Sequence, residues 1–72
     1  MSELKGRIED WYLTSVPEGV LVCGDMHNDR EKRWEDGHPI HTSLVLSIDF
    51  AAMRVTTLNS VYELGVSALP PH

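Results

Sequence analysis

Four residues of this chain carry side chains that could together bind zinc. They are Cys23 and His27, separated by three residues, then His38 and His41, separated by two residues. Thiolate and imidazole are the ligands that structural zinc prefers, and bound zinc stabilises domains with small cores. The spacing does not match an established zinc module, and the run around Cys23 is apolar enough to bury the thiol. Loop histidines are therefore the favoured interpretation, and we expect no metal or other cofactor.

Cys23 and Ser43 are the candidate nucleophiles. Cys23 could pair with any of the four histidines, and Ser43 follows His41 by two residues. Neither arrangement has the local signature of a known catalytic site, which also needs a preorganised oxyanion site and a cleft. Small domains rarely contain such a cleft. We therefore predict that the protein is not an enzyme.

Composition indicates a folded, acidic domain. The chain has 72 residues, 42% of them hydrophobic, with 11 acidic and 6 basic side chains and a net charge of -5. We expect a single domain, residues 1–72, with an ordered core at about 5–65 and a tail at 66–72. The negative charge disfavours nucleic-acid binding. One cysteine, no recognisable signal segment and apolar runs too short for a bilayer predict a soluble, cytoplasmic protein without membrane contact.

The first third of the chain predicts a hairpin. Residues 4–14 fit an amphipathic helix and also an alternating strand, with Gly6 and the aromatic residues favouring the strand. The sequence Val16-Pro17-Glu18-Gly19 is typical of a type I turn. The apolar run at 19–24, bounded by glycines, is typical of a central strand covered on both sides.

The second half predicts three more strands. Residues 44–50 alternate, with Leu44, Leu46, Ile48 and Phe50 on one face, and we expect this strand to organise the scaffold. A turn at 50–52 and a strand at 53–57 follow, then a hairpin turn at Asn59-Ser60, where a positive φ is expected, and a strand at 61–64. A helix through residues 48–62 is the rival, which the neighbouring threonines disfavour. The predicted fold is all-β, a small antiparallel curled sheet or SH3-like barrel of about five strands.

The polar stretch between Asp25 and Pro39 is the predicted partner-binding segment. It is the longest loop, and a long loop in a small domain is often functional. Trp34 could cover the core or anchor a partner. The residues expected to contact a partner are Asp29, Glu31, Trp34, Glu35 and Asp36.

Three segments carry a resemblance: Trp34-Glu35-Asp36-Gly37-His38-Pro39-Ile40-His41-Thr42-Ser43, then Ile48-Asp49, then Val55-Thr56-Thr57-Leu58-Asn59-Ser60-Val61-Tyr62-Glu63-Leu64. The pattern of Asp-Gly, Ile-x-Thr-Ser and Asn-Ser-x-Tyr-x-Leu resembles small, uncharacterised proteins encoded by phages and prophages. This resemblance implies an accessory protein in a bacterial host, such as an inhibitor of a defence system like CRISPR–Cas. It implies no catalytic residues.

Together, the charge and the resemblance predict a small acidic protein that inhibits a larger host protein by covering its surface. Two alternatives stay open at this point. One is a structural phage protein that forms homo-oligomers through its strand edges and Pro-rich tail, and the other is a zinc-stabilised mini-domain.

Overall fold

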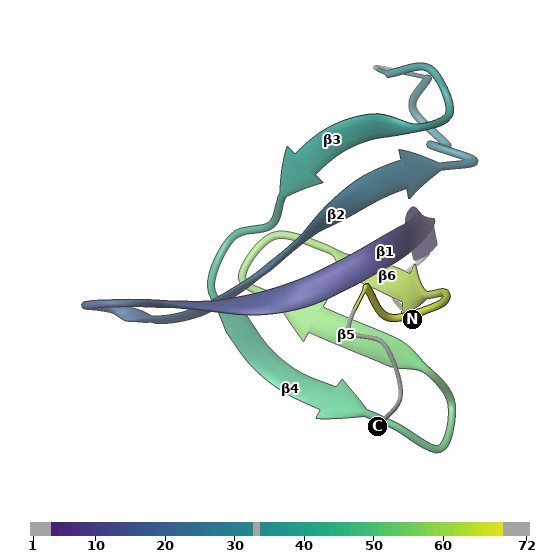
Figure 1. Ribbon diagram of the computed structural model, residues 1–72. Coiled ribbons are helices and arrows are strands. Elements are labelled where there is room, and N and C mark those ends of the chain that lie inside the picture. The colour runs from purple at the N-terminus through teal and green to yellow at the C-terminus, as the bar shows by residue number, and fades with distance from the viewer. Residues whose placement is uncertain (1–3, 33, 69–72) are drawn as a thin grey trace.

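The chain folds as a single curled β-sheet of six strands (Figure 1). The computed structural model describes residues 4–32 and 34–68, and no helix occurs among them. The strands are β1 (Leu4–Val16), β2 (Gly19–His27), β3 (His38–His41), β4 (Val45–Asp49), β5 (Arg54–Thr57) and β6 (Val61–Leu64). The prediction of an all-β fold is confirmed.

Strand order distinguishes the two predicted architectures. The order across the sheet is β3-β2-β1-β6-β5-β4, so β3 and β4 are both edges and the sheet does not close into a barrel. All neighbouring strands are antiparallel except β1 and β6, which are parallel. The sheet is therefore mixed and has six strands instead of about five, because residues 38–41, at the end of the polar stretch and just after it, form the short strand β3.

The long hairpin of β1 and β2 supplies the two strands that follow the edge strand β3 in the sheet. Strand is the correct interpretation of residues 4–14, and the turn at Val16-Pro17-Glu18-Gly19 lies where the sequence predicts it. β2 pairs with β1 on one side and β3 on the other, so it is an inner strand, but the expectation that both of its faces are covered is wrong: Val22 and Met26 are buried, whereas Cys23 on the other face is only half-buried. The pairing shifts register between Glu9 and Tyr12, where Asp10 adopts a φ of 51°. This bulge bends β1 and thereby helps to curl the sheet.

The hydrophobic core lies on the concave side of the four inner strands. Its buried members are Ile8, Val22, Met26, Val55, Tyr62 and Leu64. None belongs to β4, so the expectation that residues 44–50 organise the scaffold is wrong. β4 is an edge strand, and its contribution to the core comes from the partly buried Val45 and Ile48.

The predicted alternation of β4 fails because the strand contains a bulge. Val45 pairs with Thr57 while Ser47 pairs with Thr56, so Leu46 is inserted between two consecutive pairs. Leu46 and Phe50 are each 62% exposed. The four residues expected to share a face are therefore divided, with Ile48 directed inward and Leu46 and Phe50 outward.

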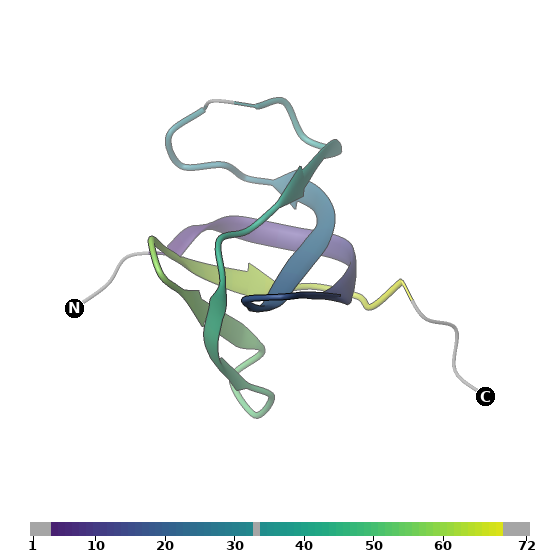
Figure 2. The same cartoon turned by 90° about the vertical axis from the view of Figure 1, so that its left-hand side faces the viewer.

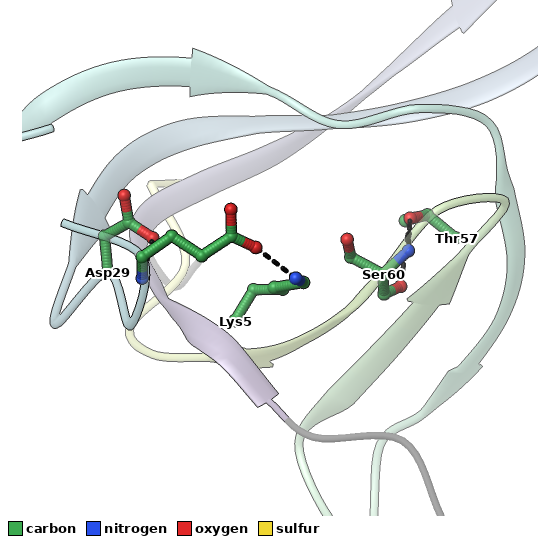
Figure 3. Close-up of polar contacts among 5 residues, drawn as sticks. Lys5, Asp29, Thr57 and Ser60 are labelled. Carbon is green, nitrogen blue, oxygen red and sulfur yellow. Dashed lines mark hydrogen bonds and ion pairs between the residues drawn. The ribbon is translucent and has the colours of Figure 1, made fainter. Parts of the chain in front are cut away.

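Side-chain hydrogen bonds close the last two turns. The hydroxyl group of Thr57 donates to the carbonyl oxygen of Ser60 (3.0 Å) and lies 3.2 Å from its amide nitrogen (Figure 3). Asn59 does not adopt the expected positive φ. In the turn after β4, Asp49 accepts hydrogen bonds from the amides of Ala51 and Ala52, and Met53 adopts a φ of 53°.

A row of charged residues crosses the outer, convex face. Cross-strand pairing connects His27 to Arg7, Arg7 to Glu63, Glu63 to Arg54 and Arg54 to Asp49. Directly opposed residues share a face, so the charges of Arg7, Glu63, Arg54 and Asp49 alternate in sign over four strands, with His27 beside Arg7 on a fifth strand. These pairs keep the convex face polar without placing like charges together.

The segment that comes after β6 in the sequence lies alongside β1 in the structure. Trp11 donates its indole N–H to the carbonyl oxygen of Gly65 (2.9 Å), and the Ala68 amide donates to the carbonyl oxygen of Trp11 (2.9 Å). Residues 66–68, the described part of the predicted tail, therefore lie across a neighbouring strand. Residues 69–72 are outside the described part of the chain.

Candidate functional site

The polar loop at residues 28–37 connects the inner strand β2 to the edge strand β3. β2 extends to His27 and β3 begins at His38, so the loop is shorter than the polar stretch from Asp25 to Pro39. It projects from one end of the sheet, well away from β4 and β5 (Figures 1 and 2). All five residues predicted to contact a partner belong to it.

Asp29 holds the loop together from the inside. Its side chain is buried, and the residue retains 7% exposure. The carboxylate accepts hydrogen bonds from the backbone amides of Glu31 (3.2 Å) and Trp34 (3.3 Å), while its carbonyl oxygen accepts from Lys32 (3.0 Å). Asp29 is thus a positioning residue of the loop, because its charge is directed toward backbone donors and away from solvent.

The loop is tied to two neighbouring strands by backbone contacts. The Arg30 amide donates to the carbonyl oxygen of Lys5 on β1, and the Gly37 amide donates to that of Met26 on β2, both at 2.8 Å. Lys5 also forms an ion pair with Glu31, drawn in Figure 3 beside Asp29. Such anchoring lowers the conformational entropy that the loop would lose on binding a partner.

Asp36 closes the loop across its base. Its carboxylate accepts a hydrogen bond from the Asn28 amide (2.9 Å), where Asn28 has a φ of 54°. Asparagine tolerates this left-handed conformation better than most residues. The exposed carboxylate of Asp36 therefore has a fixed position relative to the end of β2.

Trp34 folds back toward the sheet and remains partly accessible. Its indole packs against the hydrophobic core cluster. It also stacks on the imidazole of His38, with ring centroids 5.8 Å apart and an interplanar angle of 3°. The structure therefore supports the prediction that Trp34 covers part of the core, and the half-buried ring leaves an edge that a partner could contact.

The residues of the loop surround an open hollow of about 510 Å³. Asn28 and Lys32 line it together with four of the predicted residues, Asp29, Trp34, Glu35 and Asp36. Glu35 and Asp36 are exposed, and among the lining residues that the structure describes, Lys32 supplies one positive charge against the carboxylates of Asp29, Glu35 and Asp36. The hollow is thus an acidic surface beside an aromatic ring, suited to an arginine or lysine side chain.

Sequence reasoning missed two lining residues of this hollow, Asn28 and Lys32. Both have a φ of 54°, which turns the chain around the hollow. Lys32 belongs to the run Asp29-Arg30-Glu31-Lys32-Arg33, in which acidic and basic side chains alternate. This alternation does not indicate which of the side chains line the hollow. Glu31, which was predicted as a contact residue, instead lies on the Lys5 side of the loop.

The four possible zinc ligands are not brought together. Cys23 is the cross-strand partner of His41, whereas His38 pairs with the buried Met26 and so lies on the opposite face of the sheet. In residues 4–32 and 34–68, no group of three or more histidine, cysteine, aspartate or glutamate side chains could hold a metal ion. The zinc hypothesis is therefore wrong for the described chain.

The candidate nucleophiles have structural contacts. The thiol of Cys23 lies 3.4 Å from the hydroxyl group of Thr14, and the hydroxyl group of Ser43 accepts a hydrogen bond from the Asn59 amide (3.3 Å). Cys23 is half-buried. Ser43 connects the link between β3 and β4 to the turn before β6, which is a structural role.

Within the part of the chain that the structure describes, no helix has the length and apolar character needed to cross a membrane. Comparison with models of known protein families, with curated proteins and with solved structures finds no match to this chain.

Proposed function

We propose that this protein is a small acidic binding protein that inhibits a larger protein by covering part of its surface with the loop at residues 28–37. The proposed partner is a protein of a bacterial host, and the proposed compartment is the host cytoplasm. The resemblance to phage and prophage proteins alone supports a defence-system component, such as one of a CRISPR–Cas system, as the target. In this proposal the protein catalyses no reaction.

The main support is the combination of fixed backbone and exposed acidic side chains in this loop. Asp29 is buried and binds loop amides, while Glu35 and Asp36 are exposed around the same hollow. A long loop without such anchoring would lose more conformational entropy on binding. A preformed binding surface needs a fixed shape. In this loop, the buried carboxylate of Asp29 holds that shape.

Charge favours a basic partner surface. The net charge of -5 gives a long-range attraction to positive surfaces, and the hollow adds a local concentration of carboxylates. Complementary charges mainly raise the association rate and select the partner. The partner contact is therefore expected to weaken as salt concentration rises.

Trp34 supplies the apolar part of the proposed contact. Tryptophan is enriched among residues that dominate binding energy, particularly where surrounding polar residues exclude water. Here the polar residues Lys32, Glu35 and Asp36 line the same hollow as the indole. We expect the exposed ring edge to become buried in the complex.

Quantitative affinity capture from a bacterial lysate tests the proposal. The bait proteins are wild type, Trp34→Ala and a matched control, Tyr12→Ala, whose aromatic ring is exposed on β1. Proteins captured by wild type and Tyr12→Ala should be lost with Trp34→Ala. Circular dichroism checks that each bait is folded. If Trp34→Ala is folded and retains every captured protein, the loop is not the binding surface.

A further inference from the structure

A second, smaller hollow adjoins the loop at residues 28–37. It has a volume of about 190 Å³ and lies where the start of β1, the end of β6 and the base of the loop meet (Figure 1). We call it the arginine hollow, and its lining residues are Leu4, Gly6, Arg7, Asn28, Arg30 and Glu63. Asn28 also lines the larger hollow beside Trp34, so the two hollows share a wall.

Two guanidinium groups from different elements line the arginine hollow. Arg7 belongs to β1, and its Nε atom lies 2.8 Å from Oε2 of Glu9, in an ion pair that orients the side chain. Arg30 belongs to the loop, and its backbone amide donates to the carbonyl oxygen of Lys5 (2.8 Å). A guanidinium carries five N–H donors, more than the single Nε contact of Arg7 uses. The sheet and the loop thus place two groups with many donors around one space.

Positive charge is in excess at the arginine hollow. The row of charged residues on the convex face has its basic end here, because the cross-strand neighbour of Arg7 on β2 is His27 and not an acid. Arg30 adds a second cation beside Arg7. Arg30 is exposed and forms no ion pair with a carboxylate of residues 4–32 or 34–68. A bound anion would therefore extend the alternation of charges beyond Arg7.

We propose that the arginine hollow is a carboxylate-binding site that takes an aspartate or glutamate side chain of the same partner that places a basic side chain in the larger hollow. Planar guanidinium groups bind carboxylates through paired N–H···O hydrogen bonds. The proposal rests on the function proposed for the loop. It specifies a partner surface on which a carboxylate and a basic group lie on opposite sides of the contact with Asn28.

Glu63 selects a carboxylate over a phosphate group. In the described lining, Arg7 and Arg30 against Glu63 leave one net positive charge, which matches the single charge of a carboxylate. A phosphate monoester carries a charge of about -1.5 to -2 at neutral pH. It would be repelled more strongly by Glu63 and by a protein with a net charge of -5.

The two hollows together orient the partner. The larger hollow presents the exposed carboxylates of Glu35 and Asp36, whereas the smaller one presents Arg7 and Arg30. A surface with the same two charges in reversed order would place like charges together at both positions. Such juxtaposition disfavours incorrect partners more than it changes the affinity of the correct one.

An NMR titration of the full chain with sodium acetate tests the proposal without the partner. Amide resonances are followed up to about 200 mM acetate, a range chosen because exposed ion pairs are individually weak. Sodium chloride and inorganic phosphate at the same ionic strength are the comparisons. Acetate should give saturable shifts at Arg7, Asn28 and Arg30 that chloride does not give, and phosphate should bind more weakly. Equal responses to acetate and chloride, or tighter binding of phosphate, would overturn the proposal.

Three variants test the roles of individual charges. Arg30→Gln should weaken acetate binding about fivefold or more, because it removes one guanidinium and keeps the backbone anchor to Lys5. Lys32→Gln removes the same charge from the same loop but lines the larger hollow, so it should change acetate binding less than about twofold. Glu63→Gln should tighten acetate binding and remove the discrimination against phosphate. Equal losses in Arg30→Gln and Lys32→Gln would contradict a site at the arginine hollow.

The captured partner separates this proposal from the one for the loop. Arg30→Gln should weaken partner binding about fivefold, and Lys32→Gln should not weaken it. If Trp34→Ala abolishes capture while Arg30→Gln binds as wild type, the loop retains its function and the partner carboxylate is contradicted. If Trp34→Ala retains capture, the function proposed for the loop is wrong, and the shared partner is wrong with it, even where acetate binds.

Discussion

The indole of Trp34 lies parallel to the imidazole of His38, with the ring centroids 5.8 Å apart. The contact joins the middle of the loop to the first residue of β3, so the edge strand sets the orientation of the aromatic ring proposed to meet a partner. Aromatic pairs of this type stabilise by about 0.5–1.5 kcal/mol beyond the apolar area that they bury.

Replacing His38 should therefore weaken binding without removing a partner contact. His38→Ala releases the Trp34 ring, and we expect a several-fold loss of affinity and a changed NMR resonance of the Trp34 indole N–H. His38→Phe restores an aromatic surface and should recover most of the affinity. Equal losses in the alanine and phenylalanine variants would show that stacking does not position Trp34.

Asp29 should control the shape of the loop. In Asp29→Ala, the amides of Glu31 and Trp34 lose a charged acceptor, which should lower the free energy of unfolding by about 1–3 kcal/mol. Hydrogen exchange should accelerate at residues 30–36 and remain unchanged in β6. Glu35→Gln, at an exposed carboxylate, serves as the control. Indistinguishable exchange in the two variants would exclude the positioning role of Asp29.

Thr42 extends the pairing of β2 beyond the end of β3. Its amide donates to the carbonyl oxygen of Val22 (2.9 Å), and its hydroxyl oxygen accepts from the Val22 amide (3.1 Å). Thr42→Val leaves that buried amide without an acceptor and should cost about 1–3 kcal/mol in chemical denaturation. Thr42→Ser keeps the hydroxyl group and should cost less. A smaller loss for valine than for serine would contradict this account.

Gly24 provides space for the bulge in β1. A methyl group on Gly24 would lie 2.6 Å from Cγ2 of Ile8 and 2.7 Å from the carbonyl oxygen of Glu9. Because backbone must shift, Gly24→Ala should cost about 2 kcal/mol or more. At Gly37 nothing lies within 4 Å, but φ is 90°, so Gly37→Ala should cost about 1 kcal/mol. The reverse ranking of melting temperatures would contradict the packing argument.

The sequence predicted strand positions well where short-range patterns decide them. The turn at Val16-Pro17-Glu18-Gly19 depends on local turn chemistry, and the strand at 61–64 depends on its alternation, although the positive φ expected at Asn59 before it is not observed. Alternation failed in β4, because the bulge at Leu46 depends on pairing with Thr56 and Thr57. The parallel pairing of β1 with β6 also depends on tertiary contacts between distant segments, which local patterns do not encode.

The sequence located the candidate site but did not predict the role of each residue. Asp29 and Asp36 look alike in a polar stretch, yet one is buried under the loop and the other is exposed. The difference arises from which backbone amides converge on each carboxylate, and this requires the folded loop. Similarly, Cys23, His27, His38 and His41 are close in sequence, but strand alternation places His38 on the other face.

The most direct measurement is the affinity of the captured partner for Glu35→Lys compared with Glu18→Lys. Both substitutions reverse an exposed glutamate, one beside the hollow and the other in the turn between β1 and β2. The account predicts that Glu35→Lys weakens binding about tenfold or more, mainly at low salt, and that Glu18→Lys changes it less than about twofold. Equal affinities for the two variants would contradict a binding surface at residues 28–37.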